Sequence, residues 1–273
     1  MRYGLPIVGF LALVTAVVYG KIACQFHYGT GEVRSVHATA TSVVLVDEWD
    51  ANADNDDLPE YRTRLIRFDA ATGRELDRVD LGHRLDCAPA NAGHLWCWGE
   101  VLALVRLDDL EVVADAGAYY GEGAPLGPEA PSGEHMRYHD GRMHLRAIDG
   151  AWHVVAGSEA TPQPTEPPPR REPPEVGRVY TSSVPEAAGF LDPKRLRVRE
   201  GDLPFVLYAE TLRADAGKKL QHDSGTVVEL APKIGLEAYA PAGTDHVLVI
   251  TEDLAPTVLR LAADGSLVWR TPV

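Results

Sequence analysis

The unit that decides the fold is Leu259-Arg260-Leu261-Ala262-Ala263-Asp264-Gly265-Ser266-Leu267-Val268-Trp269, close to the carboxyl end of the chain. A short apolar run leads into an acidic turn, and a second short run follows the turn. Asp and Gly tolerate the left-handed backbone that tight turns need, so this pattern predicts a β-hairpin.

Units of the same form recur along the chain. Acidic turns at residues 69–73, 108–110 and 149–150 each separate two short runs. Beyond residue 24, no stretch of a dozen residues keeps the 3.6-residue apolar period of an amphipathic helix. We therefore expect a mainly β body, with strands at residues 42–46, 63–68, 101–105, 142–148, 206–208, 246–250 and 257–261.

Two of these units resemble repeats of the quinoprotein-like (PQQ-like) β-propeller proteins. The stretch Phe68-Asp69-Ala70-Ala71-Thr72-Gly73-Arg74-Glu75 is similar to the family's Asp-x-x-Thr-Gly turn, and the unit ending at Trp269 is similar to its strand-turn-strand with a docking Trp. Asp77 stands where a docking Trp would follow Gly73. The resemblance does not carry over the quinone cofactor, because no paired-cysteine or calcium–quinone set can be matched.

The resemblance implies an all-β, β-propeller-like fold. At roughly 40–50 residues per blade, the body makes about five irregular blades. An open ring would leave a strand edge unpaired, so we expect residues 33–39 to pair with the carboxy-terminal blade. An irregular β-sandwich, or two small β units joined by a central linker, are the competing folds.

The amino-terminal segment predicts delivery to a membrane. Eighteen uncharged residues run from Tyr3 to Gly20, close to the ~20 that a transmembrane helix needs. Arg2 before the run predicts an amino terminus in the cytoplasm and a body outside it, on the periplasmic side of a bacterial inner membrane. We expect residues 1–24 to be an anchor or signal and residues 25–273 to be the extracytoplasmic domain; cleavage after Gly20, giving a secreted protein, and lipidation at Cys24 are alternatives.

An oxidising compartment would make a disulfide between Cys87 and Cys97 stabilising, whereas the alternative is two small buried side chains. A proline-rich excursion separates the two halves of the domain, since residues 161–174 include seven prolines. We expect this excursion to be polyproline II or disordered, and not part of a sheet. Its run Pro167-Pro168-Pro169-Arg170-Arg171 is either a docking motif for an aromatic groove or a solvated loop.

The acidic stretch at residues 47–60 carries seven of the chain's 40 carboxylates, in a protein with a net charge of −14. Asp50, Asn52 and Asp54, with Asp57, resemble the start of a calcium loop, in which alternate oxygens converge on a hard cation. The alternative is a solvated acidic hairpin tip. We expect no other cofactor.

Two further groups favour structural interpretations. His135, His139 and His144, with Glu134 and Asp140, meet no zinc spacing and indicate a surface or interface face. The stretch Asp223-Ser224-Gly225-Thr226 looks like an aspartic-protease turn, but it has no second copy and favours a plain turn.

No catalytic set is evident in the sequence. The favoured function is therefore a membrane-tethered, extracytoplasmic binding or scaffold module with an unknown protein partner. The net charge argues against nucleic acid as a partner, because nucleic acid attracts basic proteins. The alternative is an extracytoplasmic hydrolase or lyase that uses carboxylates and histidines, with or without calcium.

Overall fold

The structure, a computed structural model, describes residues 32–52, 59–90, 93–122, 124–127, 135–156, 161–169, 177–184, 191–211, 213, 216–252 and 255–273. These residues form antiparallel β-sheets joined by turns, with one 3-10 turn, η1 (Ala116–Ala118). The prediction of a mainly β protein is confirmed.

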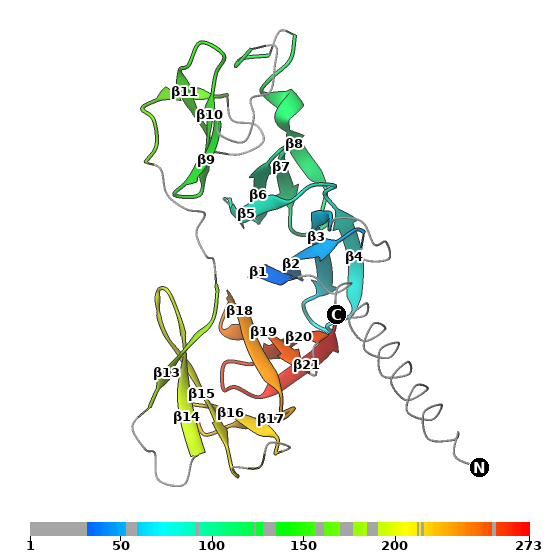
Figure 1. Cartoon of the computed structure of the whole chain (residues 1–273), viewed down its shortest axis with the longest axis vertical. Helices are drawn as coiled ribbons and strands as arrows, with labels where there is room; N and C mark the ends of the chain where they lie inside the picture. The colour runs from blue at the N-terminus through cyan, green and yellow to red at the C-terminus, as the bar shows by residue number, and fades with distance from the viewer. Residues whose placement is uncertain are drawn as a thin grey trace, which may run out of the picture.

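The strands fall into five separate sheets, numbered here in chain order (Figure 1). Sheet 1 contains β1 (Glu32–Ala38), β2 (Ser42–Asp50), β3 (Tyr61–Asp69) and β4 (Glu75–Asp80). Sheet 2 contains β5 (Leu85–Pro89), β6 (His94–Gly99), β7 (Leu102–Arg106) and β8 (Val112–Asp115). Sheet 3 contains β9 (Met136–His139), β10 (Arg142–Arg146), β11 (Trp152–Val155) and β12 (Gln163–Thr165).

Sheet 4 has five strands: β13 (Tyr180–Ser183), β14 (Leu191–Val198), β15 (Gly201–Ala209), β16 (Lys218–His222) and β17 (Val227–Leu230). Sheet 5 contains β18 (Ile234–Ala242), β19 (Asp245–Glu252), β20 (Ala255–Leu261) and β21 (Leu267–Pro272). Each sheet is a meander in which neighbours in sequence are neighbours in space. Every run predicted as a strand lies in one of these elements, except that β7 begins at Leu102, after residue 101, and β10 ends at Arg146, before residue 148.

The acidic turns hold the hairpins together through local hydrogen bonds. Asp69 accepts hydrogen bonds from the backbone N–H and the hydroxyl of Thr72, both at 2.7 Å. Asp264 accepts the same pair of bonds from Ser266, at 2.9 and 2.7 Å. These side-chain bonds lower the pKa of both carboxyls, so the turns are built for ionised Asp.

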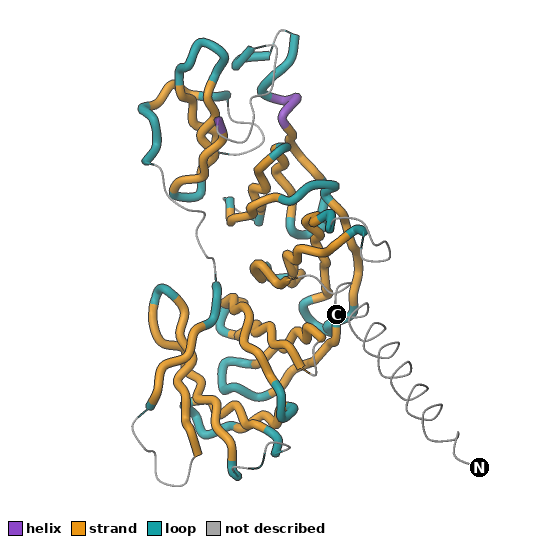
Figure 2. The backbone as a smooth tube through the Cα atoms, viewed as in Figure 1, coloured by secondary structure: helices purple, strands orange, loops and turns teal. Residues whose placement is uncertain are grey.

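The sheets pack face to face in a fixed order. Four core clusters join sheet 3 to sheet 2, sheet 2 to sheet 1, sheet 1 to sheet 5 and sheet 5 to sheet 4. Alternation along each strand makes this stacking work: Val43 and Leu45 face sheet 5, whereas Val44 and Val46 face sheet 2. The backbone therefore follows an arc that has sheets 3 and 4 at its ends (Figure 2).

The seam between sheets 5 and 1 is fixed by the Trp269 side chain. Its indole N–H donates to the carbonyl of Ala70 at 2.8 Å, and Thr271 donates to the carbonyl of Gly73, also at 2.8 Å. Gly73 adopts a φ of +70°, and a Cβ there would lie 2.5 Å from the indole ring. Only glycine allows this close approach.

Sheet 1 uses a different pair at its seam with sheet 2. Arg67 lies opposite Asp77 in the register of β3 and β4, as Arg260 lies opposite Trp269 in β20 and β21. The guanidinium of Arg67 donates to the carbonyl of Asp108 and pairs with Asp77 at 3.1 Å. Arg260 makes the equivalent bond to the carbonyl of Ala70, so both seams use an arginine, and Asp77 stands beside Arg67 where sheet 5 has Trp269.

The structure corrects the β-propeller-like prediction. The described residues form five separate antiparallel sheets and no closed barrel, and sheets 3 and 4 share none of the four core clusters. The outward face of sheet 4 is built from charges, with ion pairs between Arg195 and Asp223, Arg197 and Asp202, and Lys219 and Glu210. A charged, paired face gains little by packing against another sheet, so this end of the stack stays open.

The prediction that residues 33–39 pair with the carboxy-terminal blade is also wrong. β1 pairs with β2 along its length, and β21 completes sheet 5 from within that sheet. β1 meets sheet 5 through side chains, because Val36 packs in the cluster that contains Ala238 and Ala240.

The predicted membrane anchor at residues 1–24, with Cys24, lies outside the described residues. Among the residues that the structure does describe, no helix is long and apolar enough to span a bilayer. The described residues therefore give no support to the predicted transmembrane helix or to a membrane contact through it, and neither is carried further.

The proline-rich excursion at 161–174 differs from its prediction in one respect. Gln163, Pro164 and Thr165 form β12, which pairs with β11 at the edge of sheet 3. Proline lacks a donor, so an edge strand is where a sheet tolerates it.

Candidate binding pocket

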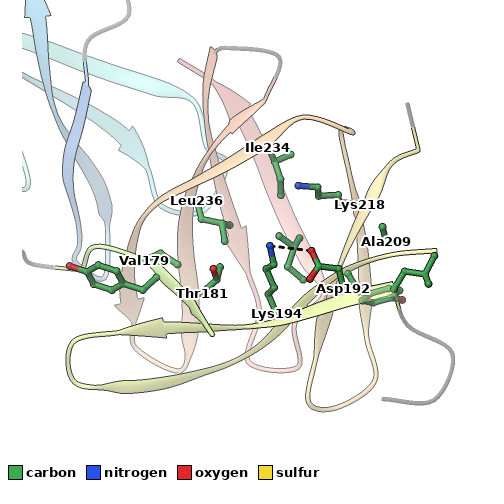
Figure 3. Close-up of a pocket in the computed structure, with 12 residues that line it drawn as sticks. Val179, Thr181, Asp192, Lys194, Ala209, Lys218, Ile234 and Leu236 are labelled. Carbon is green, nitrogen blue, oxygen red and sulfur yellow. Dashed lines mark ion pairs between the residues drawn. The ribbon is translucent and has the colours of Figure 1, made fainter. Parts of the chain in front are cut away.

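A pocket of about 410 Å³ lies at one end of the interface between sheets 4 and 5 (Figure 3). Strands β13, β14, β15 and β16 of sheet 4 contribute most of its lining, and Ile234 and Leu236 of β18 contribute the wall from sheet 5. Its volume falls within the roughly 300–1,000 Å³ of small-molecule sites. The lining residues are Val179, Tyr180, Thr181, Leu191, Asp192, Lys194, Leu207, Tyr208, Ala209, Lys218, Ile234 and Leu236.

The pocket exists because two core-facing positions carry lysine. On β14 the residues that face sheet 5 are Lys194, Leu196 and Val198, and on β16 they begin with Lys218 and Leu220. Leu196 and Leu220 are fully buried in the shared core. Lys194 and Lys218 occupy the core-facing positions two residues before Leu196 and Leu220. At these positions the two sheets leave an open pocket between them in place of packed apolar side chains.

Charge in the pocket is unevenly satisfied. Lys194 pairs with Asp192 at 3.1 Å, while Lys218 forms no ion pair within the described part of the chain. Both amino groups point into the same space (Figure 3). Two lysines and one aspartate give the pocket a local charge of 2 − 1 = +1 in a protein of net charge −14.

The backbone at Asp192 supports this arrangement. Its φ is +47°, a left-handed conformation that non-glycine residues adopt at a cost. The irregular register between Leu191 and Lys194 in β14 places the Asp192 carboxylate beside the Lys194 amino group, so one cation is neutralised internally. Lys218 is then the group that is left for a ligand.

Of the four residues predicted to bind calcium, the structure describes Asp50 and Asn52; Asp54 and Asp57 lie outside the described residues. One Asp50 oxygen accepts the backbone N–H groups of Asn52 and Glu60, at 3.0 and 2.9 Å. Asp50 therefore closes the base of its loop, and the calcium site stays a prediction. Among the described residues, no three His, Cys, Asp or Glu side chains are grouped to hold a metal.

Cys87 and Cys97 lie directly opposite each other on β5 and β6, with Cα atoms 4.2 Å apart. Their sulfur atoms are bonded in the structure. This pair closes sheet 2 at its first hairpin, away from the pocket residues in the fold.

The predicted histidine group does not form a site. His139 pairs with Asp140 at 3.3 Å, and its ring centroid lies 6.2 Å from that of His144. Burial lowers the pKa of His144, so this side chain is neutral at pH 7. Glu134 lies outside the described residues. Asp223 occupies the turn between β16 and β17 and pairs with Arg195 at 2.6 Å, as a plain turn residue.

Sequence reasoning missed all three charged pocket residues. A usable signal existed: lysine at positions 194 and 218 interrupts the apolar alternation that continues with Leu196 and Leu220. A polar residue at a core-facing position indicates a functional site when nothing structural requires it.

Comparisons with known proteins add no functional assignment. No family model matches the chain, and no curated protein matches it. Among solved structures, the computationally designed Ika8 protein is similar at a TM-score of 0.26 and 10% identity, over 89% of this chain and 87% of that chain. A likeness at this level carries no argument about fold or function. The resemblance to quinoprotein-like repeats stays a prediction.

Proposed function

We propose that the protein is an extracytoplasmic binding protein whose pocket takes a small organic anion with an apolar body. The observation that carries the proposal is Lys218, a cation without an ion-pair partner in the described residues that points into a pocket with both polar and apolar lining residues. A carboxylate would pair with Lys218, and its hydrocarbon part would lie against Leu207, Ile234 and Leu236. A binding or scaffold role also fits the sequence analysis, whereas no observation favours the hydrolase or lyase alternative.

Titration calorimetry on the full chain tests the pocket with octanoate, and with octanol as the uncharged probe of equal length. Octanoate is expected to bind more tightly than octanol, and Lys218→Met is expected to weaken octanoate binding by about tenfold, since a charge-assisted bond is lost. Lys233→Met is the matched control, because Lys233 is exposed and outside the pocket lining. Equal losses in both variants, or equal binding of both probes, would contradict the proposal.

The extracytoplasmic location rests on the bonded Cys87–Cys97 pair, because disulfides persist in oxidising compartments. The two cysteines are expected to resist alkylation in intact cells until a reductant is added, as read by mass spectrometry. Reduction should lower the free energy of unfolding by about 3 kcal/mol, since the bond closes a short loop in the unfolded chain. Alkylation of both thiols without reductant would place the protein in a reducing compartment.

A further inference from the structure

The segment from Thr161 to Pro169 lies on the protein with a three-residue period. Pro162 and Thr165 are half-buried and Pro168 is buried, whereas every other residue of the segment is exposed. This spacing is that of a polyproline II helix, which has three residues per turn, and it runs through Gln163–Thr165, which pair with β11 as the edge strand β12. The prolines therefore do not form a free linker here.

Arg137 on β9 and Trp152 on β11 receive this segment. Arg137 donates from Nη1 to the carbonyl oxygen of Pro168 at 2.9 Å, and its guanidinium carbon lies 4.6 Å from the centroid of the Trp152 ring. In the register of β11 and β12, Trp152 lies opposite Thr165. The ring, the guanidinium and the inward side of the helix thus meet in one place.

These side chains lie on the face of sheet 3 that points away from the rest of the protein. Met136 and Val155 point into the core shared with sheet 2, while their neighbours Arg137 and Trp152 alternate to the other face. Trp152 is outside that core cluster, yet it is only 8% exposed. The Trp152 ring is therefore shielded from solvent on the outward face of sheet 3, where Arg137 stacks on it and Thr165 lies opposite it.

The chemistry of this contact is that of polyproline recognition. A polyproline II helix has no internal hydrogen bonds, so its carbonyls are free acceptors, and its rigid rings dock on aromatic side chains at low entropic cost. Here Trp152 supplies the aromatic ring, and Arg137, which stacks on that ring, supplies the donor to the proline carbonyl. We propose that Arg137 and Trp152 form a polyproline-binding site, which the chain fills with its own residues 162–168 and which takes a proline-rich peptide when that segment is withdrawn.

The test uses the full chain with Pro167→Gly, Pro168→Ser and Pro169→Gly, which removes the prolines at the Arg137 contact and leaves the pairing of β12 with β11 in place. A fluorescent peptide with the sequence of residues 161–171 is titrated against this variant and the unchanged protein, and anisotropy is measured. The variant should bind the peptide saturably, and the unchanged protein should bind it at least about tenfold more weakly, because its own segment competes at an effective concentration near ~1 mM. A peptide with alanine in place of every proline should not bind.

Arg137→Ala in the same background should weaken peptide binding by about tenfold, through loss of the carbonyl bond and the stacked cation. Arg142→Ala is the matched control, because Arg142 is an exposed arginine of the same sheet. Absence of binding up to about 1 mM peptide would overturn the proposal, since a segment with so weak an affinity could not stay docked in its own chain. Equal losses for both arginine variants would also overturn it.

If the triple variant does not fold, amide exchange on the chain with intact prolines gives the answer. Arg137→Ala should speed the exchange of Gln163, Thr165 and Glu166, and Arg142→Ala should not. Unchanged exchange in Arg137→Ala would show that pairing of β12 with β11 alone holds the segment, and the proposal would fail.

Discussion

Replacing Trp269 with alanine is expected to lower the free energy of unfolding by about 4 kcal/mol, as for other buried tryptophans. Trp269 is 8% exposed and packs in the core cluster between sheets 1 and 5. Its N–H also satisfies the carbonyl of Ala70, on the turn of the next sheet. The substitution therefore opens a cavity and removes one of the hydrogen bonds across the seam, while those from Thr271 and Arg260 remain.

Urea unfolding followed by far-ultraviolet circular dichroism measures this effect. Trp269→Phe should cost clearly less than Trp269→Ala, because it keeps most of the ring volume and loses only the N–H bond. Gly73→Ala should also be destabilising, since its Cβ would meet the indole at 2.5 Å and its φ is +70°. In the Trp269→Ala background the clash with the ring is relieved, and only the contact with Thr271 Oγ1 at 2.8 Å and the positive φ remain. Gly73→Ala should therefore cost less there, and a double-substitution cycle reports the difference. Additive losses would show that the two residues do not form one seam.

The strands and turns of this protein could be predicted because they depend on neighbouring residues. The alternation in Thr63–Phe68 and the Asp69–Gly73 turn each act over a few residues, and the structure has both. Asp77 shows the limit of repeat matching. Asp77 replaces the tryptophan of the repeat there. The hydrogen bond from Arg67 to the carbonyl of Asp108 could not be predicted, because it depends on the position of Asp108 in another sheet.

The stacking of the sheets and the pocket could not be predicted, because they depend on which faces meet. Closing the stack would require apolar residues on the outward face of sheet 4, where β14 carries Arg195 and Arg197. Alternation in β14 predicts that Leu196 points inward, but not that sheet 5 is the sheet it meets. The pocket depends further on Lys194 and Lys218, which are 24 residues apart in sequence and come together because β14 and β16 both flank β15.

The proline segment was misjudged for a physical reason. A run of prolines cannot supply donors to a ladder, and this argument holds for Pro164. It does not hold for the carbonyls, which remain acceptors, and Arg137 uses the carbonyl of Pro168. Composition therefore predicted an extended segment, but neither the pairing of Gln163–Thr165 with β11 nor the bond from Arg137 to the segment.

A second large loss is expected from Arg64→Ala, of about 3–5 kcal/mol, because it leaves a buried carboxylate without its partner. Arg64 lies opposite Asp47 in the register of β2 and β3, and its Nε donates to Asp47 Oδ1 at 3.0 Å. The two side chains are 12% and 2% exposed. Water therefore cannot replace the guanidinium once it is removed.

The exposed pair between Arg197 and Asp202, in sheet 4, provides the control. Its atoms lie 2.6 Å apart, but the side chains are 51% and 62% exposed, so Arg197→Ala should cost less than about 1 kcal/mol. Asp47→Leu combined with Arg64→Met should recover most of the loss, because two apolar side chains need no partner. If Arg64→Ala costs no more than Arg197→Ala in urea unfolding, water reaches Asp47, and the end of β2 is less tightly closed than its burial indicates. If the double variant is as unstable as Arg64→Ala, the guanidinium acts through its packing on Trp49, whose ring centroid lies 5.5 Å from the guanidinium carbon, and not through the charge of Asp47.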